Sequence, residues 1–372
     1  MHAELEATVA ATKLRFSASR VASIVGLHEY GDAIEIFLEY VYQDLDDLLA
    51  VDARLLGLTL VSKDEELYNL MQKSGSASSL EGVVRWANKT SVANISTAND
   101  LASKVMTIAA SACEAKKLSA AEAQRLQEGL REKLRTNVGK RNESLAIAAY
   151  EAQLGYVYSP HADFEALLRV QASNDAYYYI LYPDPATATD AGCVCMRFAN
   201  CAERVTKTKG DGRSLASTAH YFSLCGMVDG TTEVLRIDGE DDWRTELIVV
   251  EVKNRLHRFR DPVPLHDCVQ MAVYMQMLGV SQGDLVQCLH DDRTAICVTR
   301  VVSSEPPLSS PACACACRRK SDLWSTVVVP RLYEYAAAIY TLRLQDLRRL
   351  AFLQAPPETQ RAMLREMVSY DL

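Results

Sequence analysis

The segment that most constrains the fold of this chain is the apolar run Leu247-Ile-Val-Val, which leads directly into Glu251-Val-Lys253. Consecutive aliphatic residues, most of them β-branched, are typical of a strand that is buried in the middle of a sheet. Successive side chains of a strand point to opposite faces, so Glu251 and Lys253 project together while Val252 turns away. The sequence therefore predicts a central strand whose end carries an acid and a base on one face.

A second acid ends the segment Cys225-Gly-Met-Val-Asp229, and a neighbouring strand could hold it beside Glu251 and Lys253. Two carboxylates and a lysine can hold a divalent metal beside a phosphate, and a lysine next to two acids is expected to stay charged. Simpler interpretations exist, because an aspartate before Gly230 suits a tight turn and a Glu–Lys pair on an exposed strand stabilises little. The buried character of the strand favours the site.

An aspartate followed by Glu-x-Lys resembles the PD-(D/E)xK nuclease superfamily. Segments 14–26, 139–155 and 268–279 are similar to pieces of its lambda-exonuclease-like (viral recombinase type) branch, and they occur in the family's order. The chain departs from the pattern at Val228, where the family often has proline, and in the long separation of its aspartate from Glu-x-Lys. The resemblance implies an α/β fold: a restriction-endonuclease-like α/β/α sandwich with a mixed central sheet, here with a helical insertion.

The resemblance and the chemistry of the side chains together assign roles. Asp229 and Glu251 are the predicted ligands of Mg²⁺ or Mn²⁺, with the backbone carbonyl of Val252 as a third, and Lys253 acts on the attacking water and the phosphate. Glu143 is the predicted ligand of a second metal, directly or through water. The other predicted site residues are Gln270 near the lysine or the phosphate, and Ser19, Arg15, Arg20, Arg255 and Tyr274 on the substrate.

The expected activity is metal-dependent hydrolysis of phosphodiester bonds at DNA ends, as by an exonuclease of recombination, repair or replication. Three alternatives stay open: an RNA substrate, endonucleolytic cleavage, and a noncatalytic scaffold or nucleic-acid-binding subunit of a larger complex. The intact Asp229, Glu251 and Lys253 favour the enzyme, since a degenerate site is expected to lose at least one of them.

Composition limits the class of protein. With 372 residues, 49% hydrophobic and 24% charged, the chain is an ordinary globular one. Its formal net charge of −8 argues against binding nucleic acid over the whole surface. The segment 253–260 is nevertheless a basic cluster just after the predicted site, with a solvated loop as the simpler interpretation. No apolar run approaches the roughly 18–20 residues that span a bilayer, so we expect no membrane segment.

An intracellular location is expected because the N-terminus has no secretory signal. The mitochondrion and the nucleus are both compatible with the sequence, although Glu4 and Glu6 weaken an organellar presequence. Eleven cysteines then indicate free thiols in a reducing compartment. Two clusters, Cys193/Cys195/Cys201 and Cys313/Cys315/Cys317, raise the alternative of a metal or iron–sulfur site, but their single-residue spacers differ from the usual two-residue ones.

The predicted organisation follows from the patterns along the chain. It comprises an N-terminal helical part of the nuclease domain (1–44), a helical insertion (45–135), a nuclease core (136–302, with a flexible loop at 183–215), a low-complexity Cys-rich loop (303–329) and a C-terminal helical segment (330–372). The insertion is a candidate surface for a homo-oligomer or a protein complex. Ser119, followed by Glu122, is a predicted helix N-cap.

Within this organisation the predicted elements are helices at 99–137, 141–155, 265–279 and 330–354, strands at 177–182, 219–228, 232–238 and 246–253, and a hairpin of 284–289 with 294–301.

Overall fold

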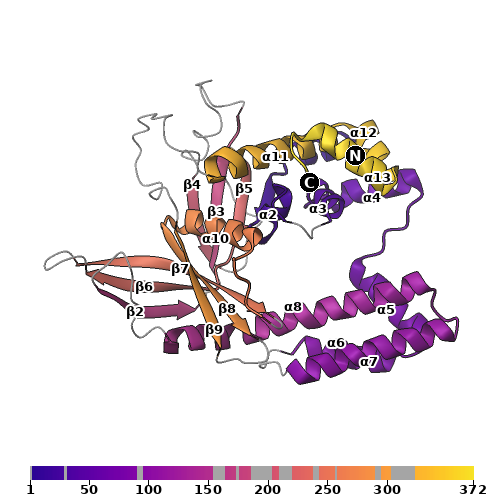
Figure 1. Cartoon of the computed structure of the whole chain (residues 1–372). Helices are drawn as coiled ribbons and strands as arrows, with labels where there is room; N and C mark the ends of the chain where they lie inside the picture. The colour runs from indigo at the N-terminus through magenta and orange to yellow at the C-terminus, as the bar shows by residue number, and fades with distance from the viewer. Residues whose placement is uncertain are drawn as a thin grey trace.

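The computed structural model describes residues 2–28, 32–89, 95–153, 164–172, 176–185, 203–208, 220–237, 243–255, 258–289, 295–302 and 323–372. These residues contain both helices and strands, which is consistent with the α/β class (Figure 1). The strands form two mixed sheets, whereas the sequence predicted a single central one. Among the described helices, none combines the length and the apolar character needed to cross a membrane.

The first sheet has four strands in the order β1 (Leu14–Ser17), β5 (His220–Gly226), β3 (Ala176–Pro183) and β4 (Glu203–Thr208). β1 is parallel to β5, and the other pairs are antiparallel. β4 corrects the prediction of a continuous loop over 183–215. A polar segment has no strand signal of its own, and β4 becomes a strand by pairing with the Tyr-rich β3.

The second sheet has five strands in the order β2 (Phe164–Ala172), β6 (Gly230–Ile237), β7 (Trp243–Arg255), β8 (Gln282–Leu289) and β9 (Ile296–Val302). Only the β7–β8 pair is parallel among these described strands. The predicted central strand is β7, and the predicted hairpin is β8 with β9. β2 was not predicted from the sequence.

The two sheets meet where β5 passes into β6. These successive strands belong to different sheets, so the chain changes sheets at Met227-Val-Asp229. A Cβ on Gly226 would lie 2.8 Å from Cε1 of Tyr274 and 3.0 Å from Cβ of Ala18. Only glycine permits this close approach, and it brings three separate segments together just before Asp229.

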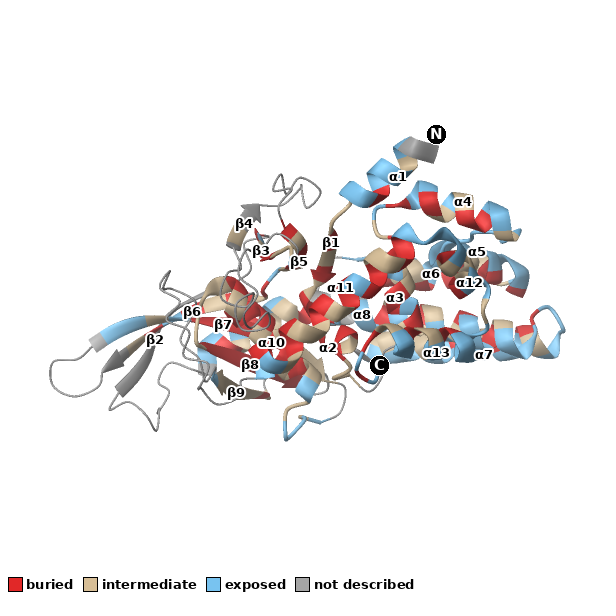
Figure 2. Cartoon of the chain, turned by 90° about the horizontal axis from the view of Figure 1, so that it is seen from above, coloured by how far each residue is buried: buried red, intermediate tan, exposed pale blue. Residues whose placement is uncertain are grey.

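Helices from both ends of the chain share one hydrophobic core with the four-stranded sheet. They are α1 (His2–Ala11), η1 (Ala18–Arg20), α2 (Val21–Ile24), α3 (Ala33–Val41), α4 (Asp46–Leu56), η2 (Trp324–Val328), α11 (Val329–Leu344), α12 (Asp346–Gln354) and α13 (Pro357–Met367). Figure 2 shows buried residues concentrated along α2, α10 (Leu265–Leu278) and α11. The predicted single helix over 330–354 is wrong, because Gln345 leaves the helical conformation (φ −112°, ψ 85°) and separates α11 from α12.

A separate helical cluster contains α5 (Lys63–Ser74), α6 (Ala77–Ala87), α7 (Ile95–Glu114) and the first half of α8 (Ala120–Gln153). It has its own core, which includes Leu80, Leu126 and Leu130. The N-terminus of α8 has the predicted capping box: Glu122 N donates to Ser119 Oγ at 3.3 Å, and Ser119 N donates to Glu122 Oε2 at 2.9 Å.

The second half of α8 leaves this cluster and packs on β7, β8 and β9 (Figure 1). The sequence predicted separate helices at 99–137 and 141–155, but α8 continues without a break and the earlier part of the first segment belongs to α7. α4, which the sequence placed in the insertion, instead packs on α12 through an ion pair of Asp52 with Arg349.

Several predictions lie outside the described residues: most of the loop at 183–215, both Cys clusters and most of the Cys-rich loop.

Candidate active site

The candidate site lies where the chain changes sheets. β6 pairs with β7 only as far as Gly230 opposite Val250, so Val252 lies beyond the end of β6. Its amide donates to Oδ2 of Asp229 at 2.7 Å, which means that this carboxylate occupies the place of a missing neighbouring strand. The N–H and C=O of one strand residue point to the same side. The carbonyl of Val252 therefore faces the side on which Asp229 lies.

Glu251 and Lys253 project from the same face of β7, as predicted, and Gln270 of α10 joins them. Lys253 Nζ donates to Glu251 Oε1 at 2.9 Å and to Gln270 Oε1 at 2.7 Å. Gln270 Nε2 donates to the same Glu251 Oε1 at 2.8 Å. Glu251 is only 3% exposed, and its other oxygen, Oε2, is buried without a hydrogen-bond donor among the described residues.

The electrostatics reflect acids that are buried close together. Burial raises the pKa of Glu251 to about 8, with a further contribution from Asp229 and an opposing one from Lys253. Burial and then the charge of Glu143 raise the pKa of Asp229. Burial by itself lowers the pKa of Lys253, but Glu251 and Asp267 outweigh it and raise this pKa, so the lysine stays charged.

Glu143 comes from the half of α8 that packs on β7, and its charge contributes to the raised pKa of Asp229. The described residues contain no group of three or more His, Cys, Asp or Glu side chains placed to hold a metal ion. Asp229 and Glu251 form a pair of acids that could bind an ion. Carbonyl oxygen and water would supply the remaining ligands.

α10 presents one face to β7. Asp267, Gln270 and Tyr274 follow one another at spacings of three and four residues, which puts them on one side of the helix. Asp267 is 3% exposed; its Oδ1 lies 3.6 Å from Lys253 Nζ, and its Oδ2 pairs with Arg255. The sequence prediction missed Asp267, although its spacing from Gln270 on a predicted helix would have indicated the shared face.

The side chain of Arg255 is largely buried and bound by neighbouring side chains. Besides its pairing with Asp267, its Nε donates to Oε1 of the buried Gln287 at 2.9 Å. Gln287 also bonds to the backbone of Arg260 through its Oε1 and Nε2. The sequence offered no signal for Gln287, because only the parallel β7–β8 register places it beside Lys253.

The N-terminal segment approaches the same place from the other sheet. β1 runs parallel to β5 with Ser17 opposite Cys225, so η1 begins next to Gly226. Ser19 is exposed, and its Oγ lies 3.0 Å from Oγ of Ser17.

The predicted substrate-binding arginines of this segment each have an acidic partner. Arg15 Nη2 lies 2.7 Å from Asp44 Oδ2, and Arg20 Nη2 lies 3.5 Å from Glu39 Oε2. Tyr274, also predicted to touch substrate, is 5% exposed and accepts a hydrogen bond from Gln270 Nε2 at 3.2 Å. Tyr274 is therefore buried and holds the side chain of Gln270 in place.

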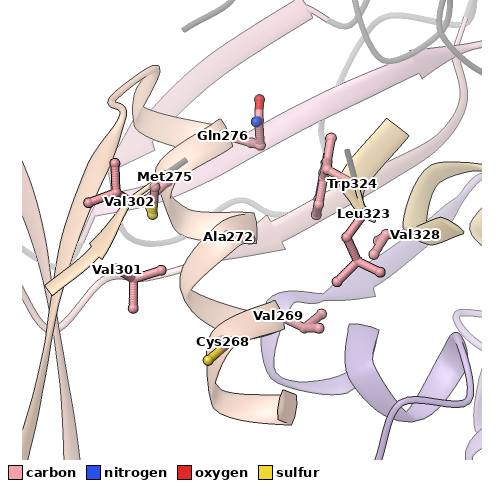
Figure 3. A pocket seen from close by; sticks show the side chains of 10 residues that line it. All are labelled: Cys268, Val269, Ala272, Met275, Gln276, Val301, Val302, Leu323, Trp324 and Val328. Atoms are coloured by element: carbon pink, nitrogen blue, oxygen red, sulfur yellow. The ribbon is translucent and has the colours of Figure 1, made fainter. Parts of the chain in front are cut away.

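The other side of α10 borders a cavity of about 150 Å³ (Figure 3). Val269 and Met275 of α10, Val301 of β9, and Trp324 of η2 contribute to its mainly apolar lining, which includes no acidic or basic side chain among the described residues. The polar chemistry of this region thus belongs to the β7 side of the helix.

Comparison of the chain with models of known protein families, with curated proteins and with solved structures found no match.

Proposed function

We propose that the protein is a metal-dependent nuclease of the PD-(D/E)xK type, built on a restriction-endonuclease-like core. The observation that carries the proposal is the state of Glu251. One of its oxygens binds Lys253 and Gln270, while the other is buried and has no partner among the described residues besides the second acid, Asp229. Two acids buried against each other are costly to ionise, and a cation that they share would remove that cost.

The residues at the site fit a hard divalent cation. Asp229 and Glu251 would hold Mg²⁺ or Mn²⁺, with the carbonyl of Val252 on the same side and Glu143 nearby for a direct or water-mediated contact. Mg²⁺ commonly keeps several waters and takes only one or two carboxylates from the protein. When bound, the ion would supply positive charge to the phosphate and make a water more acidic.

The remaining residues have roles that follow from their contacts. Lys253 stays charged beside the two acids, so it can steady the scissile phosphate and orient the attacking water. Gln270 fixes the ammonium group of Lys253 from one side. The exposed Arg258 and Arg260 follow directly after β7 and would meet the phosphate backbone.

The proposed substrate is the end of a DNA strand, and the proposed setting is intracellular recombination, repair or replication. Support comes from the N-terminal segment, which the β1–β5 pairing brings to Gly226, three residues before Asp229. Ser19 offers an exposed hydroxyl there. For Arg15 and Arg20 to bind a terminal phosphate, each would have to exchange its present acidic partner for the phosphate.

The test is cleavage of a 5′-phosphorylated, end-labelled duplex and of its single strand, with Mg²⁺, with Mn²⁺ and with chelator. The same assay with RNA and with circular DNA separates the substrate classes and distinguishes end-dependent from internal cleavage. We expect metal-dependent release of nucleotides from linear DNA. We also expect Glu251→Gln and Lys253→Ala to lower the rate by on the order of 10²–10³.

The matched control is Glu246→Gln, which makes the same change on the same strand at a residue that bonds to Gln282. This variant should cleave like the wild type. Absence of metal-dependent cleavage of every substrate by the wild-type chain would refute the nuclease and leave the noncatalytic scaffold.

A further inference from the structure

A buried polar network lies behind the candidate site, between α8 and the five-stranded sheet. Tyr150 of α8 is fully buried, and its hydroxyl donates to Oδ2 of Asp284 at 2.6 Å. Asp284 is 1% exposed and also accepts from Arg300, whose Nη2 lies 3.0 Å from the same oxygen. The network joins one helix to β8 and β9 through a single carboxylate.

The position of this network relative to the site is set by strand register. In the parallel β7–β8 pair, Asp284 lies opposite Val250, the residue before Glu251. Tyr150 is therefore anchored at nearly the same level of the sheet as the catalytic strand end. Glu143 precedes Tyr150 by seven residues on the same uninterrupted helix.

Seven residues make almost two helical turns, so Glu143 and Tyr150 share one face of α8 and lie about 10 Å apart along the axis. Ala146 and Ile147, between them, pack in a small core with Val250 and Val252. Such apolar contacts are not directional. The hydrogen bond of Tyr150 is directional, so it adds an orientation-dependent constraint on the rotation of α8.

We infer that Tyr150, through Asp284, is a positioning residue that helps to set the rotation of α8 and thereby aims Glu143 at Asp229. This inference rests on the proposed function. It assigns Tyr150 no contact with substrate or metal. Its effect must pass through Glu143, and a double-mutant cycle can detect that route.

The chain contains a matched control for the substitution. Tyr42 donates to Oδ2 of the buried Asp52 at 2.8 Å, and Arg349 Nε donates to the same oxygen at 2.6 Å. This second Tyr–Asp–Arg network joins α3 and α4 to α12 and belongs to the helical layer of the chain termini. Tyr42→Phe thus removes the same chemical group from the same kind of network elsewhere.

The experiment measures Mn²⁺ affinity by titration calorimetry, and the rate of DNA cleavage as a function of Mn²⁺ concentration. It uses the full chain as wild type, Glu143→Gln, Tyr150→Phe, the double variant and Tyr42→Phe. We expect Tyr150→Phe to weaken Mn²⁺ affinity about 10-fold, the lower end of the range for residues that orient metal ligands. In the Glu143→Gln background it should have no further effect. Tyr42→Phe should bind Mn²⁺ and cleave as the wild type does.

The outcomes separate the two proposals. If the wild-type chain binds Mn²⁺ and cleaves DNA, but either Tyr150→Phe or Glu143→Gln has the Mn²⁺ affinity and cleavage rate of the wild type, the positioning role alone is overturned. Effects of Glu143→Gln and Tyr150→Phe that add independently also overturn it. A wild-type chain that neither binds Mn²⁺ nor cleaves refutes the proposed function, and the positioning role with it. Thermal melting of every variant verifies that the fold is retained.

Discussion

Two kinds of buried acid occur in this protein, and their surroundings differ more than their burial. Asp52 and Asp284 are each 1% exposed, and each binds an arginine and a tyrosine hydroxyl. Glu251 is 3% exposed, yet one of its oxygens has no donor among the described residues. Its nearest charged neighbours are one lysine and another acid, Asp229.

The difference in hydrogen-bond donors indicates a different role for each kind of acid. An acid with a complete set of donors ties elements together, as Asp52 ties α4 to α12 and Asp284 ties α8 to the sheet. An acid that faces a second acid carries a free-energy cost in the metal-free protein, and that cost is recovered when a cation binds. The contrast between these two kinds of acid can be tested by removing a partner from one kind and the charge from the other.

The largest expected effect is on stability, at the terminal helices. Arg349→Met leaves Asp52 buried with only Tyr42 as a donor, and breaking a buried pair in this way costs about 3–5 kcal/mol. Urea denaturation of the variant measures the loss in the free energy of unfolding. A loss below about 1 kcal/mol would show that Asp52 does not depend on its arginine.

Substitution of an acid at the candidate site should raise the activation free energy of DNA cleavage by a similar amount. Asp229→Asn should lower the rate of metal-dependent DNA cleavage by on the order of 10²–10³, equivalent to about 2.7–4 kcal/mol in the transition state. The matched change Asp52→Asn should leave the rate of the folded fraction unaltered. Equal activity losses in both variants would mean that cleavage follows stability rather than the site.

Addition of metal should stabilise the protein only through the acids that lack a full set of hydrogen-bond donors. At a Mg²⁺ or Mn²⁺ concentration of 100 Kd, binding adds about 2.7 kcal/mol to the free energy of unfolding of the wild type. Glu251→Gln should lose this gain, whereas Glu246→Gln should keep it. Thermal melting with and without the ion provides the measurement, and an equal gain in Glu251→Gln would place the ion elsewhere.

Stability is also expected to depend on pH in the metal-free protein. The folded-state pKa of Glu251 is raised to about 8, so this group contributes stability that is complete below its unfolded pKa and is lost as pH rises through about 8. One proton corresponds to a slope of at most about 1.4 kcal/mol per pH unit. Glu251→Gln should reduce the slope between pH 5 and pH 8 in denaturation experiments.

The control for this pH dependence is Asp52→Asn, which should keep the wild-type slope. A wild type and a Glu251→Gln variant with identical pH profiles would contradict the raised pKa.

Patterns of short range predicted much of the local structure. Alternation along β7 placed Glu251 and Lys253 on one face, and their hydrogen bond confirms this. Helical spacing predicted α10 with its end at Gly279, which adopts the left-handed conformation as expected of a C-terminal glycine. Such predictions succeed because each depends on residues that are close along the chain.

Predictions failed where distant partners decide the structure. β4 forms because β3 offers it a neighbour, and α8 runs on through 141 because one end packs in the helical cluster and the other on the sheet. Gln287 lies beside Lys253 only through the parallel register of β7 with β8. None of these contacts leaves a periodic signal in the sequence.

By itself, the sequence determined which side chains could form a site: an acid and a lysine on a buried strand, a second acid before it, and a glutamine on a later helix. Periodicities of 2 and 3.6 residues and local hydrogen bonds encode that much. The tertiary structure alone decided that the chain changes sheets at Asp229, that Asp267 and Gln287 hold Arg255, and that Asp284 holds Tyr150. These arrangements join residues far apart in sequence, and their geometry exists only once the helices and sheets have packed.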